Sequence, residues 1–70
     1  MMTDDELTRL RHKHLIVARS EARQLLKGVQ HMNKELADGN IPAMDLFPVL
    51  RRLHERMAVM EALDILAEDK

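Results

Sequence analysis

The side chains best suited to chemistry in this 70-residue sequence are four histidines and a group of carboxylates near the C-terminus. His12 and His14 are two residues apart, which on a helix turns their side chains about 200° apart, too far to share a metal ion. Glu61, Asp64 and Glu68 fall on one helix face, but the Glu-x-x-His pair of a dimetal bundle is missing. We therefore expect no metal site and interpret the carboxylates as a solvated acidic face.

Catalytic patterns are missing as well. The sequence has no cysteine, no glycine-rich phosphate loop and no Ser-His-acid arrangement that its spacing supports. Small two-helix enzymes such as chorismate mutases bind acidic substrates with buried arginines, whereas the arginines here fall mainly on the expected outer face. We expect no enzyme activity, no cofactor and no small-molecule substrate.

Composition indicates one small domain covering residues 1–70. Net charge is −1 with 33% charged residues, so the chain has no global attraction to nucleic acid or anionic lipid. No apolar stretch approaches 18 residues, and the first residues are acidic where a signal peptide would be basic. We expect a cytoplasmic protein that does not enter a membrane.

The first expected helix covers about residues 4–37. Thr3 and Glu6 have the spacing of a capping box, and the acids around them suit the positive end of a helix dipole. Gly39 stands where helices commonly end. A turn over residues 38–41 should follow.

The second expected helix covers about residues 42–67 and has an irregular start. Pro48 would kink the helix unless it lies in the first turn. We expect a short helical turn at 42–45, then the main helix from about Leu46 with Asp45 as its cap.

Apolar residues recur at alternating spacings of three and four in both segments, which indicates one apolar stripe along each helix. In the first helix the stripe consists of Leu15, Ala18, Ala22, Leu25, Val29, Met32 and Leu36. In the second it consists of Leu46, Leu50, Leu53, Met57 and Met60. The two stripes predict an all-α, antiparallel two-helix hairpin with a long first helix.

The start of the first helix departs from this pattern. Leu7, Leu10, His14 and Val17 cluster roughly 60° away from the stripe. Either a second partner helix contacts them, or the helix supercoils or bends near residue 14. Because both helices rise about 1.5 Å per residue, the shorter second helix should leave residues 4–14 projecting as a free arm.

Self-association is expected, because a lone hairpin of this size buries little surface and has no disulfide. Both helices are apolar on most sides at the end opposite the turn, which is typical of helices surrounded by protein. We predict a homodimer in a four-helix arrangement with its core at that end. The predicted interface residues are Leu7, Leu10, Leu15, Val17, Met60, Leu63 and Leu66.

A basic face lies opposite the stripe of the first helix. The candidate partner-binding residues on it are Arg9, Lys13, Ile16, Arg19, Arg23 and Lys27. We predict that Ile16 anchors a cytoplasmic partner protein while the neighbouring cations steer the encounter, since such a face suits a partner with carboxylates or phosphates around a pocket. Two alternatives remain open: a solvated surface, or contact with acidic residues of a second subunit.

Two functional classes compete for this basic face. A regulator that binds and inhibits a protein would use arginine, methionine and apolar anchors, which are favoured at interfaces. A nucleic-acid binder would use the same cations on phosphates. We expect the first, because the second helix is acidic and no aromatic residue is expected on the surface for stacking.

In layout, a capped helix pair with Asp38-Gly39-Asn40 between its stripes, the chain resembles Rop-type plasmid copy-number proteins. That resemblance implies an antiparallel dimeric four-helix bundle that binds paired RNA loops through the first helix, although the aromatic residue those proteins present there is missing. The chain also resembles small phage-encoded helical-hairpin regulators, which dimerise and block host proteins such as transcription activators. Its length, its lack of cysteine and its Thr3-Asp4-Asp5-Glu6 start carry that second resemblance.

Overall fold

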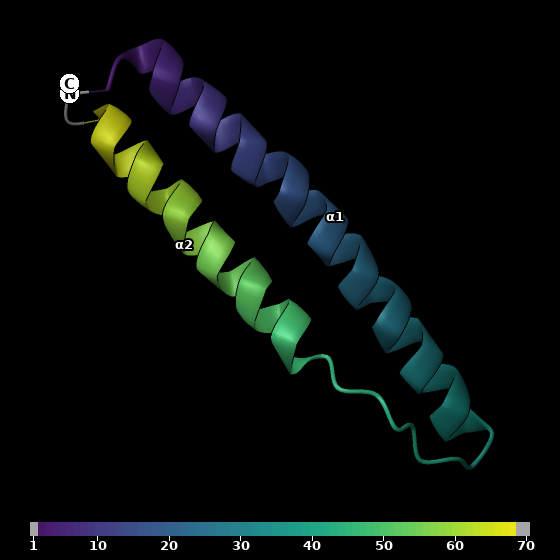
Figure 1. The fold of residues 1–70 in the computed structure, drawn as a ribbon. Coiled ribbons are helices and arrows are strands. Elements are labelled where there is room, and N and C mark those ends of the chain that lie inside the picture. Colours follow the sequence, from purple (N-terminus) through teal and green to yellow (C-terminus); the bar gives the residue numbers. More distant parts are fainter. Residues whose placement is uncertain (1, 69–70) are drawn as a thin grey trace.

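The computed structural model of the protein describes residues 2–68 and contains two helices, α1 (Asp4–Ala37) and α2 (Phe47–Glu68). The helices run antiparallel along a rod whose Cα extents are 54 × 14 × 14 Å (Figure 1). The start of α1 and the end of α2 lie at the same end. The predicted all-α antiparallel hairpin with a long first helix is confirmed.

Local signals set both ends of α1. The Thr3 side chain accepts a hydrogen bond from the Glu6 backbone N–H at 3.2 Å, so the predicted cap is present. At the other end the Asn40 N–H donates to the Glu35 carbonyl at 2.8 Å. Gly39 has a φ of 82°, a left-handed conformation that favours glycine and turns the chain out of the helix.

The connection between the helices is longer than expected. Residues 40–46 contain no helix, so the expected helical turn at 42–45 is absent. A proline disfavours helical backbone in the residue before it, so Pro42 disfavours helix at Ile41 but does not account for the absent turn at 42–45. The Asp45 carboxylate accepts the Phe47 N–H at 3.0 Å, which makes it the local start signal of α2, with Pro48 in the first turn.

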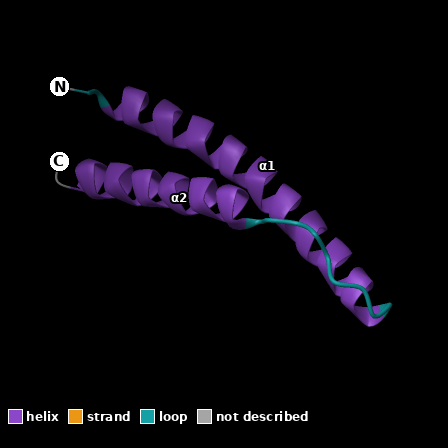
Figure 2. Ribbon diagram, turned by 60° about the horizontal axis from the view of Figure 1, so that its bottom comes forward, coloured by secondary structure: helices purple, strands orange, loops and turns teal. Residues whose placement is uncertain are grey.

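This connection decides how the helices align. Figure 2 shows it running back along the last turns of α1 as a stretched segment. A stretched chain advances about 3.3 Å per residue, against 1.5 Å in a helix. The connection therefore carries α2 toward the start of α1, over a close contact at Gly28, where an added Cβ would lie 2.5 Å from Leu46 Cδ2.

The expected free arm at residues 4–14 does not exist. Leu7 is only 5% exposed, and Leu63 near the end of α2 is 7% exposed. Arg11 Nε donates to Asp64 Oδ1 at 2.6 Å across the two helices. The end of α2 covers the first turns of α1, and the prediction of a projecting arm is wrong because it assumed a short, helical connection.

Burial differs between the two halves of the rod. We call residues 4–20 and 57–68 the terminal half, and residues 22–55 the loop half. Among the described residues the buried apolar side chains are Leu7, Ala18 and Leu63, all in the terminal half. The loop half buries only Gly28, so its apolar side chains stay partly or largely exposed.

Candidate partner-binding surface

The residues of α1 that face α2 differ from the expected stripe. At several positions the residue facing α2 is the one directly before the residue expected there. On α1, the buried and half-buried residues along the contact repeat at heptad spacing: Leu7, His14, Glu21, Gly28 and Glu35, with Ala18, Leu25 and Met32 between them. Opposite them lie Leu46, the last residue of the connection, and Val49, Leu53, Arg56, Met60 and Leu63 of α2. We call these two sets the seam. Ala22, Val29 and Leu36, expected in the stripe, are exposed instead.

The second apolar direction on α1 is explained by the seam. Leu7 and His14 face α2 of the same chain, and no further helix is needed to account for their position. Leu10 is half-buried beside them, whereas Val17 is 41% exposed. Leu7 and His14 lie to one side of the predicted stripe, and α2 packs against them because the connection has shifted α2 toward the start of α1.

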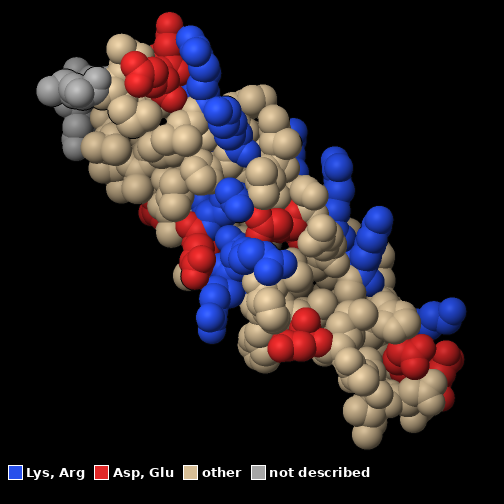
Figure 3. All heavy atoms as spheres, viewed as in Figure 1, with Lys and Arg blue, Asp and Glu red and all other residues tan. Residues whose placement is uncertain are grey.

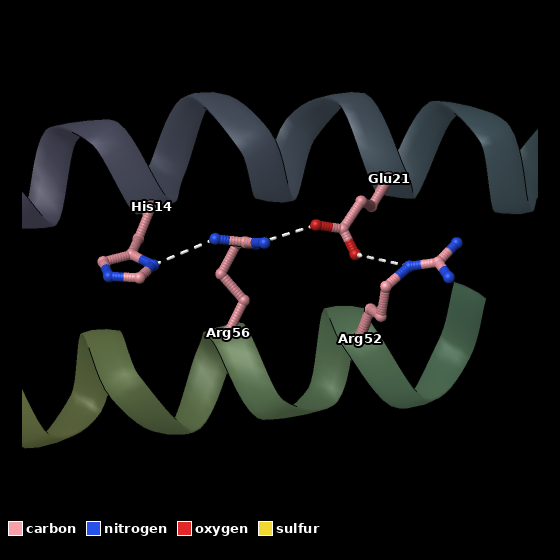
Figure 4. A network of polar contacts seen from close by, with 4 residues as sticks. All are labelled: His14, Glu21, Arg52 and Arg56. Atoms are coloured by element: carbon pink, nitrogen blue, oxygen red, sulfur yellow. Dashed lines mark hydrogen bonds and ion pairs between the residues drawn. The ribbon is translucent and has the colours of Figure 1, made fainter. Parts of the chain in front are cut away.

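A charged network crosses the middle of the seam (Figure 4). The Arg56 guanidinium donates from Nε to Glu21 Oε1 at 2.7 Å, and its Nη1 lies 3.0 Å from His14 Nδ1. The second oxygen of Glu21 has no hydrogen-bond partner, although Arg52 Nε lies 4.0 Å from it. Glu21 is 6% exposed, so its negative charge is compensated almost entirely by the two arginines of α2.

This network was missed from the sequence. Glu21, Arg52 and Arg56 lie beside the predicted apolar stripes rather than within them. Charged residues on a helix are usually solvated, so these three were not expected between the helices. One signal was present: Glu21 stands fourteen residues after Leu7 and seven after His14, in one heptad series. His14 was noted in the second apolar direction, and following that series would have led to Glu21.

The acidic face of α2 divides into paired and exposed members. Asp64 accepts both Arg11 Nε at 2.6 Å and Arg11 Nη2 at 3.4 Å, and the two side chains are 45% and 47% exposed. Glu61 and Glu68 are exposed. Within residues 2–68, no three His, Asp or Glu side chains are grouped to hold a metal ion.

The basic face of α1 points away from α2. All six candidate contact residues, Arg9, Lys13, Ile16, Arg19, Arg23 and Lys27, are exposed. Ile16 is 53% exposed, and Figure 3 shows Lys and Arg side chains following the outer edge of α1. Ion pairs in the described part of the chain involve Arg11, Arg52 and Arg56 only, so the five cations around Ile16 are unpaired there.

The predicted dimer-interface residues are scattered over different environments. Leu7 and Leu63 are buried inside the hairpin, and Leu10, Leu15 and Met60 are half-buried. Val17 and Leu66 are 41% and 53% exposed. The single aromatic residue, Phe47, is 77% exposed, which corrects the expectation of a surface without aromatics.

The chain matches no protein-family model, no curated protein and no solved structure. The likeness to Rop-type proteins and phage regulators is therefore one of hairpin layout. Neither helix of the described chain combines the length and apolar character that crossing a membrane requires.

Proposed function

We propose that this chain is a small non-enzymatic regulatory protein of the cytoplasm that self-associates and inhibits an acidic partner protein by occupying its surface. The observation that carries the proposal is the outer face of α1, where the 53% exposed Ile16 lies in a row of exposed cations, Arg9, Lys13, Arg19, Arg23 and Lys27. An apolar side chain within a row of cations suits a partner that offers a pocket bordered by carboxylates.

The position of this face supports the proposal. The cations that contact the other helix are occupied: Arg11 pairs with Asp64, and Arg56 pairs with Glu21. The outer cations lie on α1, and no carboxylate of the described residues is within ion-pair distance of them. Binding there need not open the hairpin, since the seam lies on the opposite side of α1.

Substitution of Ile16 by glutamate tests the proposal, with Ile65→Glu as a matched control. Both isoleucines are 53% exposed, but Ile65 lies on α2, away from the basic face. In a pull-down from native-host lysate, we expect Ile16→Glu to lose partner capture and Ile65→Glu to retain it. Equal capture by wild type and Ile16→Glu, with unchanged helical circular dichroism, would contradict the proposed surface.

The runner-up is a nucleic-acid-binding regulator that uses the same face, because its unpaired cations would also suit phosphates. Exposed Glu55, Glu61 and Glu68 on α2 oppose a backbone lying across both helices, and Phe47 is on α2 rather than among the cations. Nuclease treatment and a salt series separate the two functions. For binding to phosphates, the logarithm of the binding constant falls linearly with the logarithm of salt concentration. Binding anchored by Ile16 should change little with salt.

A further inference from the structure

The apolar stripe of each helix does not point straight at the other helix. On α1 the stripe combines seam residues Ala18, Leu25 and Met32 with positions that directly follow a seam residue. Within the stripes these following positions carry Ala22, Val29 and Leu36 on α1 and Leu50 and Met57 on α2. Leu26 and Phe47 lie outside the stripes but also directly follow a seam residue. One residue is about 100° of rotation, so the centre of each stripe is turned roughly 50° away from the seam.

The two stripes turn toward the same broad side of the hairpin. Both helices are right-handed and run antiparallel, so a residue that follows a seam residue lies on the same side on either helix. Leu26 follows Leu25 on α1, and Leu50 follows Val49 on α2. We call the seven following residues named above the apolar side.

The large members of the apolar side are substantially exposed. Leu26 is 57%, Val29 50%, Leu50 46% and Met57 54% exposed. Helices of a four-helix bundle direct their stripes at the bundle axis, between two neighbours, rather than at one neighbour. The orientation found here is therefore the one that a second pair of helices would complete.

The distribution of charged residues indicates which side of the hairpin suits a second copy of the chain. Within residues 22–36 and 47–57, no position that follows a seam residue is Asp, Glu, Lys or Arg. A two-fold dimer places a surface against its own copy, so the surface must not repel itself. The opposite broad side, formed by residues that precede the seam, carries Lys13, Lys27, Arg52 and Glu55. The outer face of α1 carries only cations around Ile16.

We propose that a second copy of this chain docks on the apolar side, forming an antiparallel four-helix bundle centred nearer the loop half than the chain termini. This inference rests on the self-association in the proposed function and adds the face that mediates it. A stable interface removes about 800 Å² from each partner, roughly a seventh of the 5822 Å² of this chain. Such an interface leaves Ile16 outside the contact, whereas Arg19, which follows the seam residue Ala18, lies at its edge.

Two leucines of similar exposure distinguish this face from the predicted interface at the chain termini. Leu26, on the apolar side, is 57% exposed, and Leu66, on the opposite side, is 53% exposed. Sedimentation equilibrium of the full chain is measured for wild type, Leu26→Glu and Leu66→Glu. We expect Leu26→Glu to raise the dimer Kd by at least about tenfold, and Leu66→Glu by less than about threefold.

Cross-linking gives a readout that does not depend on how the glutamate variants fold. The chain has no cysteine, so Leu26→Cys and Leu66→Cys each introduce a single thiol. We expect a short bismaleimide reagent to link two copies of Leu26→Cys efficiently and Leu66→Cys poorly.

The possible failures are distinct. A wild-type chain that stays monomeric throughout would overturn both this inference and the self-association in the proposed function. A dimer that is weakened by Leu66→Glu and cross-linked through Leu66→Cys, but unaffected at Leu26, would overturn the apolar side while self-association stands.

Discussion

The two halves of the hairpin have similar apolar content but bury it differently. In the terminal half, α2 lies against α1, and Leu7 and Leu63 are both more than 90% buried. In the loop half, part of α1 is covered only by the connecting segment, and Leu36 and Ile41 stay 59% and 93% exposed. A stretched segment offers one side chain per roughly 3.3 Å along one line, too few to cover a helix face. The comparison teaches that one hairpin can complete only half of its core.

The largest effect should come from the buried leucine of the terminal half. Leu63→Ala should lower the free energy of unfolding by about 2–3 kcal/mol, because it removes a buried side chain that α1 packs against. Leu36→Ala in the loop half should cost about 0.5 kcal/mol or less in a monomer. Urea denaturation at one fixed, low protein concentration measures both.

The relative size of the two effects is the informative result. If Leu63→Ala and Leu36→Ala lowered the free energy of unfolding equally, the two halves would not differ in burial as the structure indicates. A loss at Leu36 that grows with protein concentration would instead reveal burial by a second copy.

The charged network between the halves should show the next largest effect. Glu21→Ala leaves the Arg56 guanidinium, whose side chain is 26% exposed, without its 2.7 Å partner, and should cost about 2 kcal/mol. Replacing both residues, as Glu21→Leu with Arg56→Met, should recover most of this loss, because no charge is then left unpaired in the seam. Additive losses of free energy in the cycle of Glu21→Leu, Arg56→Met and the double variant would show that the two side chains do not interact.

The smallest effect should come from the ion pair between Arg11 and Asp64. Its side chains are 45% and 47% exposed, so the short 2.6 Å contact should contribute only about 0.5 kcal/mol. Thermal unfolding of Arg11→Ala, Asp64→Ala and the double variant measures the coupling. It should disappear in 1 M salt, where charges are screened within about 3 Å. A coupling as large as that of Glu21 and Arg56 would make this pair a main determinant of helix alignment.

Most of the candidate site was predictable because it depends on one helix alone. The basic face follows from the 3.6-residue repeat of α1, and all six of its predicted residues are exposed. The alignment of the helices was not predictable in the same way. It depends on the path of residues 38–46, which form a turn at 38–39 and a non-helical stretch at 40–46 and have no periodic pattern.

The sequence by itself determined the two helices, the cap at Thr3 and the left-handed turn at Gly39. These features depend on contacts within a few residues of the chain. Only the tertiary structure decided that α2 covers the start of α1 and that Glu21, rather than Ala22, faces it. The physical reason is that contacts within one helix do not distinguish between neighbouring stripes as the face that packs against α2. The choice between them is made by the length of the connection and by a charge pair joining residues 35 positions apart.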